Sequence, residues 1–231
     1  PAPGEVLASS PAASSEAERA AARAAAAAQP AWEAAGPEER AGALLAAAEG
    51  VEARRADIVG MLVRESGSVH GKAQAEVDGA IAELRAAAAL AQQPQGRVLP
   101  PARPGHTSIA RRVPLGVVGV IAPWNVPLLL ALRSVAPALA LGNAVVLKPD
   151  PHTPVCGGAV LAEVFAGAGL PDGVFSVVLG GAETGEALVR DPGVQMISFT
   201  GSTATGRRIG QIAGGALKKL ALELGGNSPV L

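Results

Sequence analysis

Five short runs of β-branched and apolar residues, separated by glycine- and alanine-rich stretches, constrain the fold of this chain more than any other feature. The runs occupy residues 117–121, 144–147, 174–178, 196–199 and 220–222. Strands that are hydrophobic on both faces and alternate with helices are typical of a parallel sheet covered on both sides. Because crossover connections are right-handed, the pattern predicts a doubly wound α/β domain. Such a domain binds ligands at the carboxyl ends of its strands.

The residues before these runs favour helices. An alanine-rich stretch predicts a helix over residues 14–28, which we expect Pro30 to end, with Trp32 in the linker that follows. A proline followed by acidic residues predicts the start of a second helix, and the apolar spacing continues it over residues 37–64. A third helix is predicted over residues 72–91. This part of the chain is therefore expected to be a helical layer.

The segment from Pro94 to Gly105 is rich in proline and glycine and cannot be helical. The residues after it, up to Val113, are compatible with an exposed strand pair or arm. The apolar run from Val126 to Leu141 is shorter than a membrane span and contains an arginine and a proline, so we expect a buried helix there.

Composition excludes several classes of partner. The net charge is −1, and the chain has 3 Phe, 2 Trp and no Tyr, so nothing favours nucleic acid or an anionic membrane. A single cysteine excludes an internal disulfide framework and a Cys-rich zinc site, and the three histidines lack metal-ligand spacing. The expected location is therefore a reducing cytoplasm. The chain begins with Pro1 rather than Met, so a targeting segment before Pro1 is a second possibility.

Distinctive motifs follow four of the five runs, in the loops where a ligand is expected. They are Pro123-Trp124-Asn125, Lys148-Pro149-Asp150-Pro151, Phe199-Thr200-Gly201-Ser202-Thr203 and Glu223-Leu224-Gly225-Gly226.

Each motif also has a purely structural explanation. Asn125 is a common turn residue. Ser202 is a common helix cap, and the backbone N–H groups at the start of the same helix could equally bind a phosphate. Lys148 ends an apolar strand, so its charge is expected to face solvent or a ligand. Glu223 is either an exposed strand-end glutamate or a general base. Taken one at a time, these motifs do not decide between structure and function.

In combination, order and spacing, these motifs resemble the NAD(P)-dependent aldehyde dehydrogenase superfamily, and the resemblance covers nearly the whole chain. The Lys-Pro-Asp-Pro and Leu-Glu-Leu-Gly-Gly-Asn-Ser segments are similar to the benzaldehyde dehydrogenase branch. The resemblance implies N-terminal helices followed by a Rossmann-like, five-stranded parallel cofactor domain. It also implies NAD or NADP as cofactor, a small aldehyde as substrate, aromatic if the branch is right, and a homo-oligomer.

The resemblance further implies an organisation and a set of site residues. The segments expected are a helical part of the cofactor domain over 1–95, an oligomerisation-type arm over 96–115, the cofactor-binding core over 116–226 and the start of a catalytic domain over 227–231. By resemblance Asn125 is the oxyanion donor and Glu223 the general base. The cofactor-binding residues implied are Pro123, Trp124, Lys148, Gly181, Gly185, Gly201, Ser202, Leu224 and Gly225. The acid expected three residues after Lys148 is replaced by Pro151, which makes NADP plausible beside NAD.

The only cysteine, Cys156, follows a Thr-Pro pair near an expected helix start, where a helix dipole would lower the pKa of its thiol. By family position it belongs to the adenosine side, so we interpret it as structural. The resemblance places the nucleophilic cysteine beyond Leu231. We therefore expect residues 1–231 to be the front portion of an enzyme and inactive alone. The alternative is a naturally short, non-catalytic protein that binds cofactor or a partner.

Overall fold

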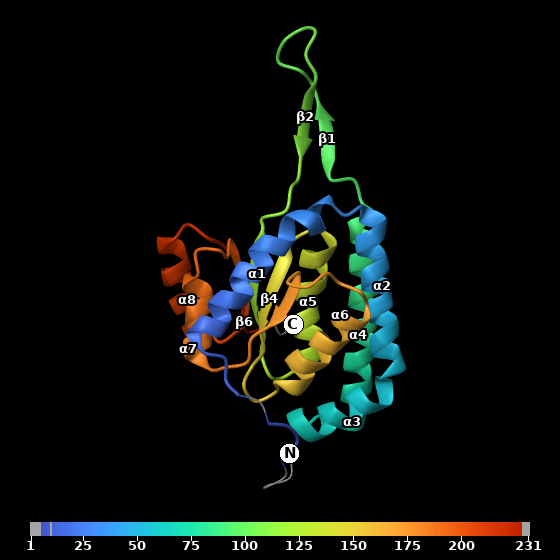
Figure 1. Cartoon of the computed structure of the whole chain (residues 1–231), viewed down its shortest axis with the longest axis vertical. Helices are drawn as coiled ribbons and strands as arrows, with labels where there is room; N and C mark the ends of the chain where they lie inside the picture. Colours follow the sequence, from blue (N-terminus) through green and yellow to red (C-terminus); the bar gives the residue numbers. More distant parts are fainter. Residues whose placement is uncertain (1–5, 10, 228–231) are drawn as a thin grey trace.

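The computed structural model describes residues 6–9 and 11–227, and Figure 1 shows a body of helices packed around a sheet, with a long hairpin projecting from it. The helices are α1 (Ser15–Ala34), α2 (Pro37–Ala53), α3 (Arg55–Ser66), α4 (His70–Ala91), α5 (Pro127–Ala140), the π-helix η1 (Val155–Ala159), α6 (Val160–Gly167), α7 (Ala182–Arg190) and α8 (Thr203–Gly215). The strands are β1 (Gly96–Leu99), β2 (Ser108–Arg111), β3 (Val117–Ile121), β4 (Ala144–Lys148), β5 (Phe175–Val177), β6 (Met196–Gly201) and β7 (Lys219–Leu224).

The central sheet has the order β5-β4-β3-β6-β7, and all its neighbouring strands are parallel. This confirms the predicted doubly wound α/β class, and each strand coincides with one of the five apolar runs. Ile121 lies opposite Lys148, and Thr200 lies opposite Glu223. The parallel arrangement therefore brings the loops after β3, β4, β6 and β7 to one edge of the sheet.

Helices cover the two faces of the sheet unequally. One face is packed by α1, α7 and α8, and the other by α5 and α6, with α2 and α4 outside them. Each face has its own apolar core: Val118, Val120 and Leu147 point toward α5, whereas Val117 and Val146 point toward α1 and α7. The apolar run at 126–141 is the buried helix α5, as predicted. Within the described part of the chain, no helix is long and apolar enough to cross a membrane.

The prediction that Pro30 ends the first helix is wrong, because α1 continues through it to Ala34. Trp32, expected in a linker, is fully buried in this helix, and its Nε1 donates to the carbonyl of Leu139 at 2.9 Å. Gln29 donates to the carbonyl of Gly142 at 3.0 Å. These tertiary contacts offset the backbone hydrogen bond that a proline removes.

The predicted second helix is also divided. It breaks at Arg54, whose φ of −103° and ψ of 12° lie outside the helical range, giving α2 and α3. The apolar spacing could not reveal this break, because Val51 and Ile58 on either side of it are both buried in the same core. Arg55 then pairs with Asp78 of α4 at 2.6 Å, which fixes the new direction of the chain.

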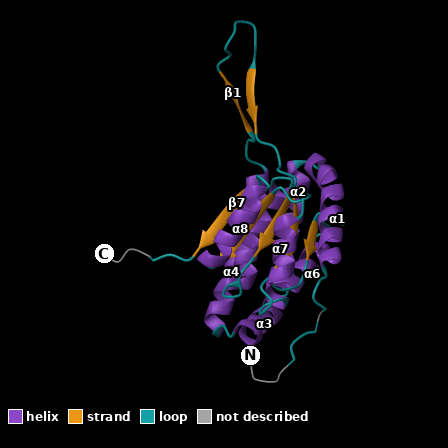
Figure 2. Cartoon of the chain, turned by 90° about the vertical axis from the view of Figure 1, so that its left-hand side faces the viewer, coloured by secondary structure: helices purple, strands orange, loops and turns teal. Residues whose placement is uncertain are grey.

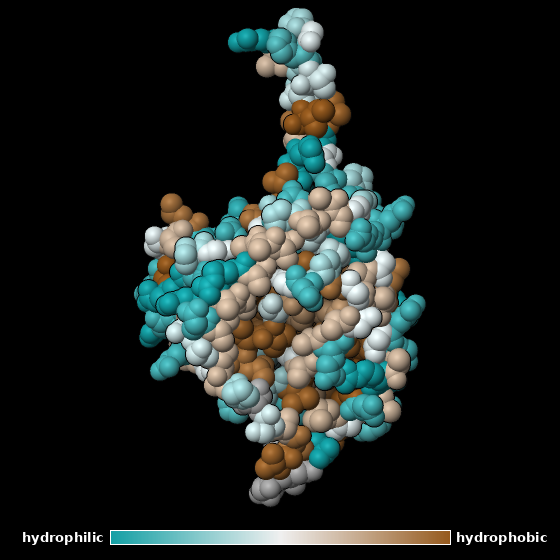
Figure 3. Space-filling model, in the orientation of Figure 1, coloured by the Kyte–Doolittle hydropathy of each residue, from teal (hydrophilic) through white to brown (hydrophobic). Residues whose placement is uncertain are grey.

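The arm is an antiparallel pair of β1 and β2, with Val98 opposite Ile109. Figures 1 and 2 show it standing clear of the helical body. Both of these side chains are exposed, and Figure 3 shows hydrophobic residues on the projecting part. The division of the chain into segments at 95, 115 and 226 stays a proposal, and residues 228–231 lie outside the described residues.

A buried carboxyl in α1 leads to a prediction about pH and stability. Glu18 is fully buried, and within the described residues neither carboxyl oxygen has a hydrogen-bond partner. Burial, reinforced by Asp191, raises the pKa of Glu18 to about 7, against the opposing charges of Arg19 and Lys218. Between its ordinary pKa and this value, the native state binds more protons than the unfolded chain. The free energy of unfolding should therefore fall as pH rises through that window.

We expect Glu18→Gln to remove this dependence, because the amide cannot ionise. The stability of the variant relative to the parent should rise by about 2 kcal/mol or slightly more between pH 5 and pH 8. Urea unfolding at the two pH values measures this difference, with Glu49→Gln, at an exposed position on α2, as the matched control. An equal difference at both pH values would show that Glu18 does not titrate in this window.

Candidate functional site

An open groove of about 1390 Å³ runs along the α5 side of the sheet and opens at its carboxyl edge. The predicted site residues that line it come from the loop after β3 and from the ends of β6 and β7 with the residues that follow them. They are Pro123, Trp124, Asn125, Gly201, Ser202, Glu223, Leu224 and Gly225. Residues more than a hundred positions apart in the sequence thus share one surface. The groove is the place where both predicted catalytic side chains meet the expected cofactor loops.

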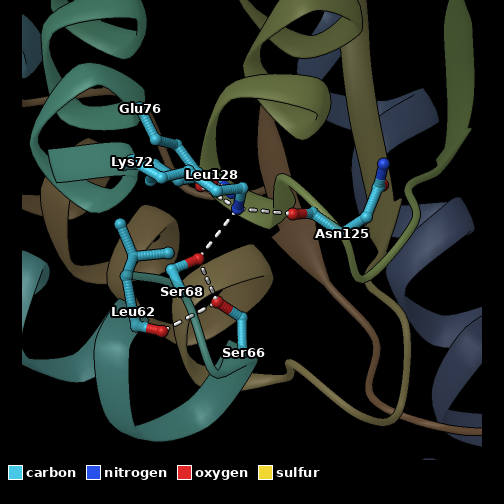
Figure 4. A network of polar contacts seen from close by, with 7 residues as sticks. All are labelled: Leu62, Ser66, Ser68, Lys72, Glu76, Asn125 and Leu128. Atoms are coloured by element: carbon cyan, nitrogen blue, oxygen red, sulfur yellow. Dashed lines mark hydrogen bonds and ion pairs between the residues drawn. The ribbon is translucent and has the colours of Figure 1, made fainter. Parts of the chain in front are cut away.

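Asn125 lies in the loop between β3 and α5 and is exposed, as is Trp124 before it. Its backbone carbonyl accepts a hydrogen bond from Lys72 at 2.8 Å. Figure 4 shows the side chain pointing away from Lys72, with its amide at the far end. A neutral amide that is free to donate is the group needed to stabilise a developing oxyanion. The structure therefore leaves Asn125 available for the predicted role.

The start of α8 forms the second part of the groove. Ser202 is the N-cap, and its Oγ accepts from the backbone N–H of Thr205 at 3.2 Å, as expected for a cap. Gly201 precedes it, and a Cβ there would lie 2.5 Å from Cζ of Phe199, so only glycine fits without moving that ring. The positive end of the α8 dipole therefore faces the groove, where an anionic group would be stabilised.

The end of β7 completes the groove. Glu223 and Leu224 are its last residues, and both are exposed at the edge of the sheet. A Cβ on Gly225 would meet only Oγ1 of Thr203, at 3.9 Å, so the backbone here is open to a ligand. Glu223 pairs in register with Thr200 of β6, and both residues line the groove. A carboxylate in this position can accept a proton from a water molecule in the groove.

The remaining predicted cofactor residues lie outside the groove, at the start of α7 and at the end of β4. Gly181 is the N-cap of α7 and is open, with no atom within 4 Å of an added Cβ. Inside the helix, an added Cβ on Gly185 would contact Cδ of Lys148 at 3.5 Å. The structure thus brings Gly185 and Lys148 together, but it does not place them in the groove.

Lys148 does not face solvent, which was one of the two positions expected for its charge. Its side chain is 5% exposed rather than facing solvent, and its Nζ donates to the carbonyl of Pro149 at 2.9 Å. Burial lowers the pKa of its ammonium, against the raising effect of Asp150. The apolar methylenes pack under Gly185 while a backbone oxygen satisfies the charge, so a strand-end lysine need not reach water.

Cys156 lies in the π-helix η1 and is fully buried. The N–H groups of Val155 and Cys156 donate to the two carboxyl oxygens of Glu65 at 2.8 and 2.7 Å. Burial, together with this carboxylate, raises the pKa of the Cys156 thiol, so the lowering expected from a helix dipole is wrong. Gly157, which follows, does not open a path to the thiol, because it is itself closely packed: an added Cβ there would lie 3.2 Å from Cβ of Pro127. Cys156 is therefore placed as a packed core residue.

Sequence reasoning missed the polar residues behind the Asn125 loop. Lys72 and Glu76 lie one turn apart on α4, where Lys72 contacts Asn125 itself and Glu76 contacts Leu128 in the first turn of α5. Their spacing of four was visible in the sequence, but nothing there indicated which loop they would meet. Among the described residues, no group of three or more His, Cys, Asp or Glu side chains could hold a metal ion.

Comparison with known proteins agrees with this geometry. The whole chain, residues 1–231, matches the aldehyde dehydrogenase family. It is 54% identical over 231 residues to a vanillin dehydrogenase of an Amycolatopsis species, covering 100% of this chain and 47% of that protein. It is 51% identical over 228 residues to the NAD(+) benzaldehyde dehydrogenase of Pseudomonas putida, covering 99% and 47%.

The crystal structure of an NAD-dependent benzaldehyde dehydrogenase from Corynebacterium glutamicum superimposes with a TM-score of 0.94 at 46% identity. The match covers 98% of this chain and 50% of that one. The chain thus spans about half the length of these relatives. From its sequence match, its fold and its groove, the chain belongs to the aldehyde dehydrogenase family.

Proposed function

We propose that the whole protein oxidises an aldehyde to a carboxylic acid, with NAD or NADP as the hydride acceptor. The observation that carries this proposal is the groove in which Asn125, the N-terminus of α8 and Glu223 meet. Family membership and relatives named for vanillin and benzaldehyde support it, and they favour an aromatic aldehyde.

The residues at the carboxyl edge fit a dinucleotide. The N-termini of α7 and α8 lie at the same edge, and Ser202 caps the second of them. Gly181 and Gly225 leave open space where side chains would otherwise intrude. We assign the pyrophosphate to Gly201 and Ser202, and the nicotinamide end to Pro123, Trp124, Leu224 and Gly225. When bound there, the cofactor would accept a hydride.

The adenosine end is assigned to Lys148, Gly181 and Gly185. To contact a ribose hydroxyl, the Lys148 ammonium would exchange its bond to the carbonyl of Pro149 for one to the ligand. Pro151 is exposed and stands where a carboxylate would repel a 2′-phosphate. For this reason we propose that NADP is accepted as well as NAD.

The chain's own catalytic groups are Asn125 and Glu223. A cysteine thiolate from outside residues 1–231 would attack the aldehyde, and the side-chain amide of Asn125 would donate to the resulting oxyanion. Collapse of this thiohemiacetal gives a thioester as the hydride leaves. Glu223 would then take a proton from the water that hydrolyses the thioester and releases the acid.

The exposed apolar arm supports a further part of the proposal, that the whole protein is a homo-oligomer. Val98 and Ile109 are 76% and 63% exposed, and a strand pair this apolar is typical of a protein contact.

The test is an absorbance assay of the whole protein with benzaldehyde, a short aliphatic aldehyde and each cofactor. We expect reduced cofactor and an equal amount of carboxylic acid, with a higher kcat/KM for benzaldehyde and with turnover on both NAD and NADP. Cofactor binding without any aldehyde-dependent reduction would refute the oxidation and favour a non-catalytic cofactor-binding protein. Turnover on NAD alone would remove only the NADP part of the proposal.

A further inference from the structure

We propose that Lys72 is a positioning residue that holds the Asn125 loop in the geometry needed for oxyanion stabilisation. This inference rests on the proposed role of Asn125 and adds to it a second element of the fold, helix α4. Asn125 and its neighbour Trp124 are both exposed, so burial of side chains does not fix this loop. Polar contacts from α4 can do so instead.

The Lys72 ammonium lies at the centre of the network in Figure 4. Its Nζ donates to the backbone carbonyl of Asn125 and to Oγ of Ser68, both at 2.8 Å. The Oε2 atom of Glu76 lies 3.7 Å away and balances the charge. Lys72 thus bonds to the backbone carbonyl of Asn125 and not to its side-chain amide.

The direction of the hydrogen bonds in this network follows from its chemistry. An ammonium can only donate, so Ser68 accepts from Lys72. The Ser68 hydroxyl is then free to donate to Oγ of Ser66 at 2.8 Å, and Ser66 donates to the carbonyl of Leu62 at 2.7 Å. This chain of hydrogen bonds ends on the backbone carbonyl of Leu62, near the C-terminus of α3. The helix dipole favours a positive charge such as the Lys72 ammonium near that end. The position of Nζ is therefore fixed from behind as well as from the loop.

Glu76 anchors the other side of the same loop. Its Oε1 accepts from the backbone N–H of Leu128 at 2.9 Å, in the first turn of α5, and the residue is 2% exposed. Lys72 and Glu76 are four residues apart on one face of α4, which packs against both α2 and α5. Helix α4 therefore holds this part of the chain through two hydrogen bonds, one to Asn125 and one to Leu128.

An oxyanion donor acts only if it is preorganised, and a misplacement of about 1 Å can cost about 10²-fold in rate. Loss of the Lys72 contact should free the Asn125 carbonyl and let the peptide rotate. We expect Lys72→Met, in the whole protein, to slow hydride transfer in the first turnover by about tenfold to 10²-fold. The dissociation constant of NAD should change far less than the rate, because Lys72 bonds to Ser68 and to the Asn125 carbonyl and to none of the residues assigned to the cofactor. Lys72→Arg, which keeps the charge and the donors, should restore part of the rate.

A double-mutant cycle separates positioning from a general structural effect. Asn125→Ala alone should slow hydride transfer by about 10²–10³-fold. In that background, Lys72→Met should have no further effect, because the group that it positions is gone. Ser68→Ala, a milder variant that removes one partner of Lys72, should follow the same pattern with a smaller loss. Lys219→Met, at an exposed lysine on the opposite edge of the sheet, is the matched control and should leave the rate unchanged.

The outcomes distinguish this inference from the function on which it rests. If Asn125→Ala slows hydride transfer but Lys72→Met does not, or if the two losses multiply, Lys72 does not act through Asn125. If Asn125→Ala leaves the rate unchanged, the oxyanion role itself is wrong, and the inference about Lys72 falls with it.

Discussion

Glu223→Gln in the whole protein is expected to lower steady-state turnover by about 10²–10⁴-fold while sparing the first hydride transfer. The carboxylate lies at the end of β7, exposed in the groove and opposite Thr200. Glutamine has nearly the same shape but cannot take a proton from water. The thioester should therefore form at close to its normal rate and then accumulate.

Rapid-mixing measurement of reduced cofactor tests this expectation. The variant should show a burst of about one equivalent per active site, followed by slow turnover. Glu38→Gln, at an exposed position in the first turn of α2, is a matched control and should behave as the parent. Loss of the burst itself would assign Glu223 chiefly to thiol activation, and unchanged steady-state turnover would remove it from catalysis.

The second large effect concerns residues 1–231 on their own, which we expect to produce no reduced cofactor. Hydride leaves a free aldehyde poorly, because its carbonyl carbon carries no electron-rich oxygen to expel it. A covalent thiohemiacetal supplies that oxygen, so a nucleophile is indispensable. The one cysteine among these residues, Cys156, is buried behind Glu65 and its thiol is held protonated.

Geometry adds to this expectation. Cys156 does not line the groove that contains Asn125 and Glu223, and Gly157 beside it packs on Pro127. Correct placement of a reacting group contributes about 7–11 kcal/mol to catalysis, and a thiol outside the groove forfeits this contribution.

The fold could be predicted from sequence where the signal is local and repeated. Strands β3 and β4 are apolar runs buried on both faces, and β5, β6 and β7 contain shorter or partly buried apolar runs, with a helical stretch between each strand and the next along the chain. The same reasoning failed at Pro30 and Arg54. There the outcome depends on partners more than twenty residues away: Leu139 for Trp32 and Asp78 for Arg55. Periodicity within one segment contains no information about such partners.

The site was predictable to a similar extent. Parallel strands place their carboxyl ends together, so the loops at Asn125, Ser202 and Glu223 were expected to meet, and they line one groove. The surroundings of single side chains were not predictable. Lys148 was expected to face solvent or a ligand, and its ammonium is buried against the carbonyl of Pro149. No motif indicated that the Cys156 thiol would lie beside the carboxylate of Glu65. Lys72 and Glu76 reach the loop from another helix, and only the tertiary structure reveals that contact.

The measurement that tests the central claim most directly is aldehyde-dependent cofactor reduction by three proteins assayed together. These are the whole protein, its Cys156→Ala variant and residues 1–231 alone, with benzaldehyde and NAD. If this chain provides the cofactor groove, Asn125 and Glu223 but not the nucleophile, the first two proteins will turn over at similar rates and the third will not turn over. Loss of turnover in the Cys156→Ala variant, or steady turnover by residues 1–231 that requires Cys156, would contradict the account and make Cys156 the nucleophile.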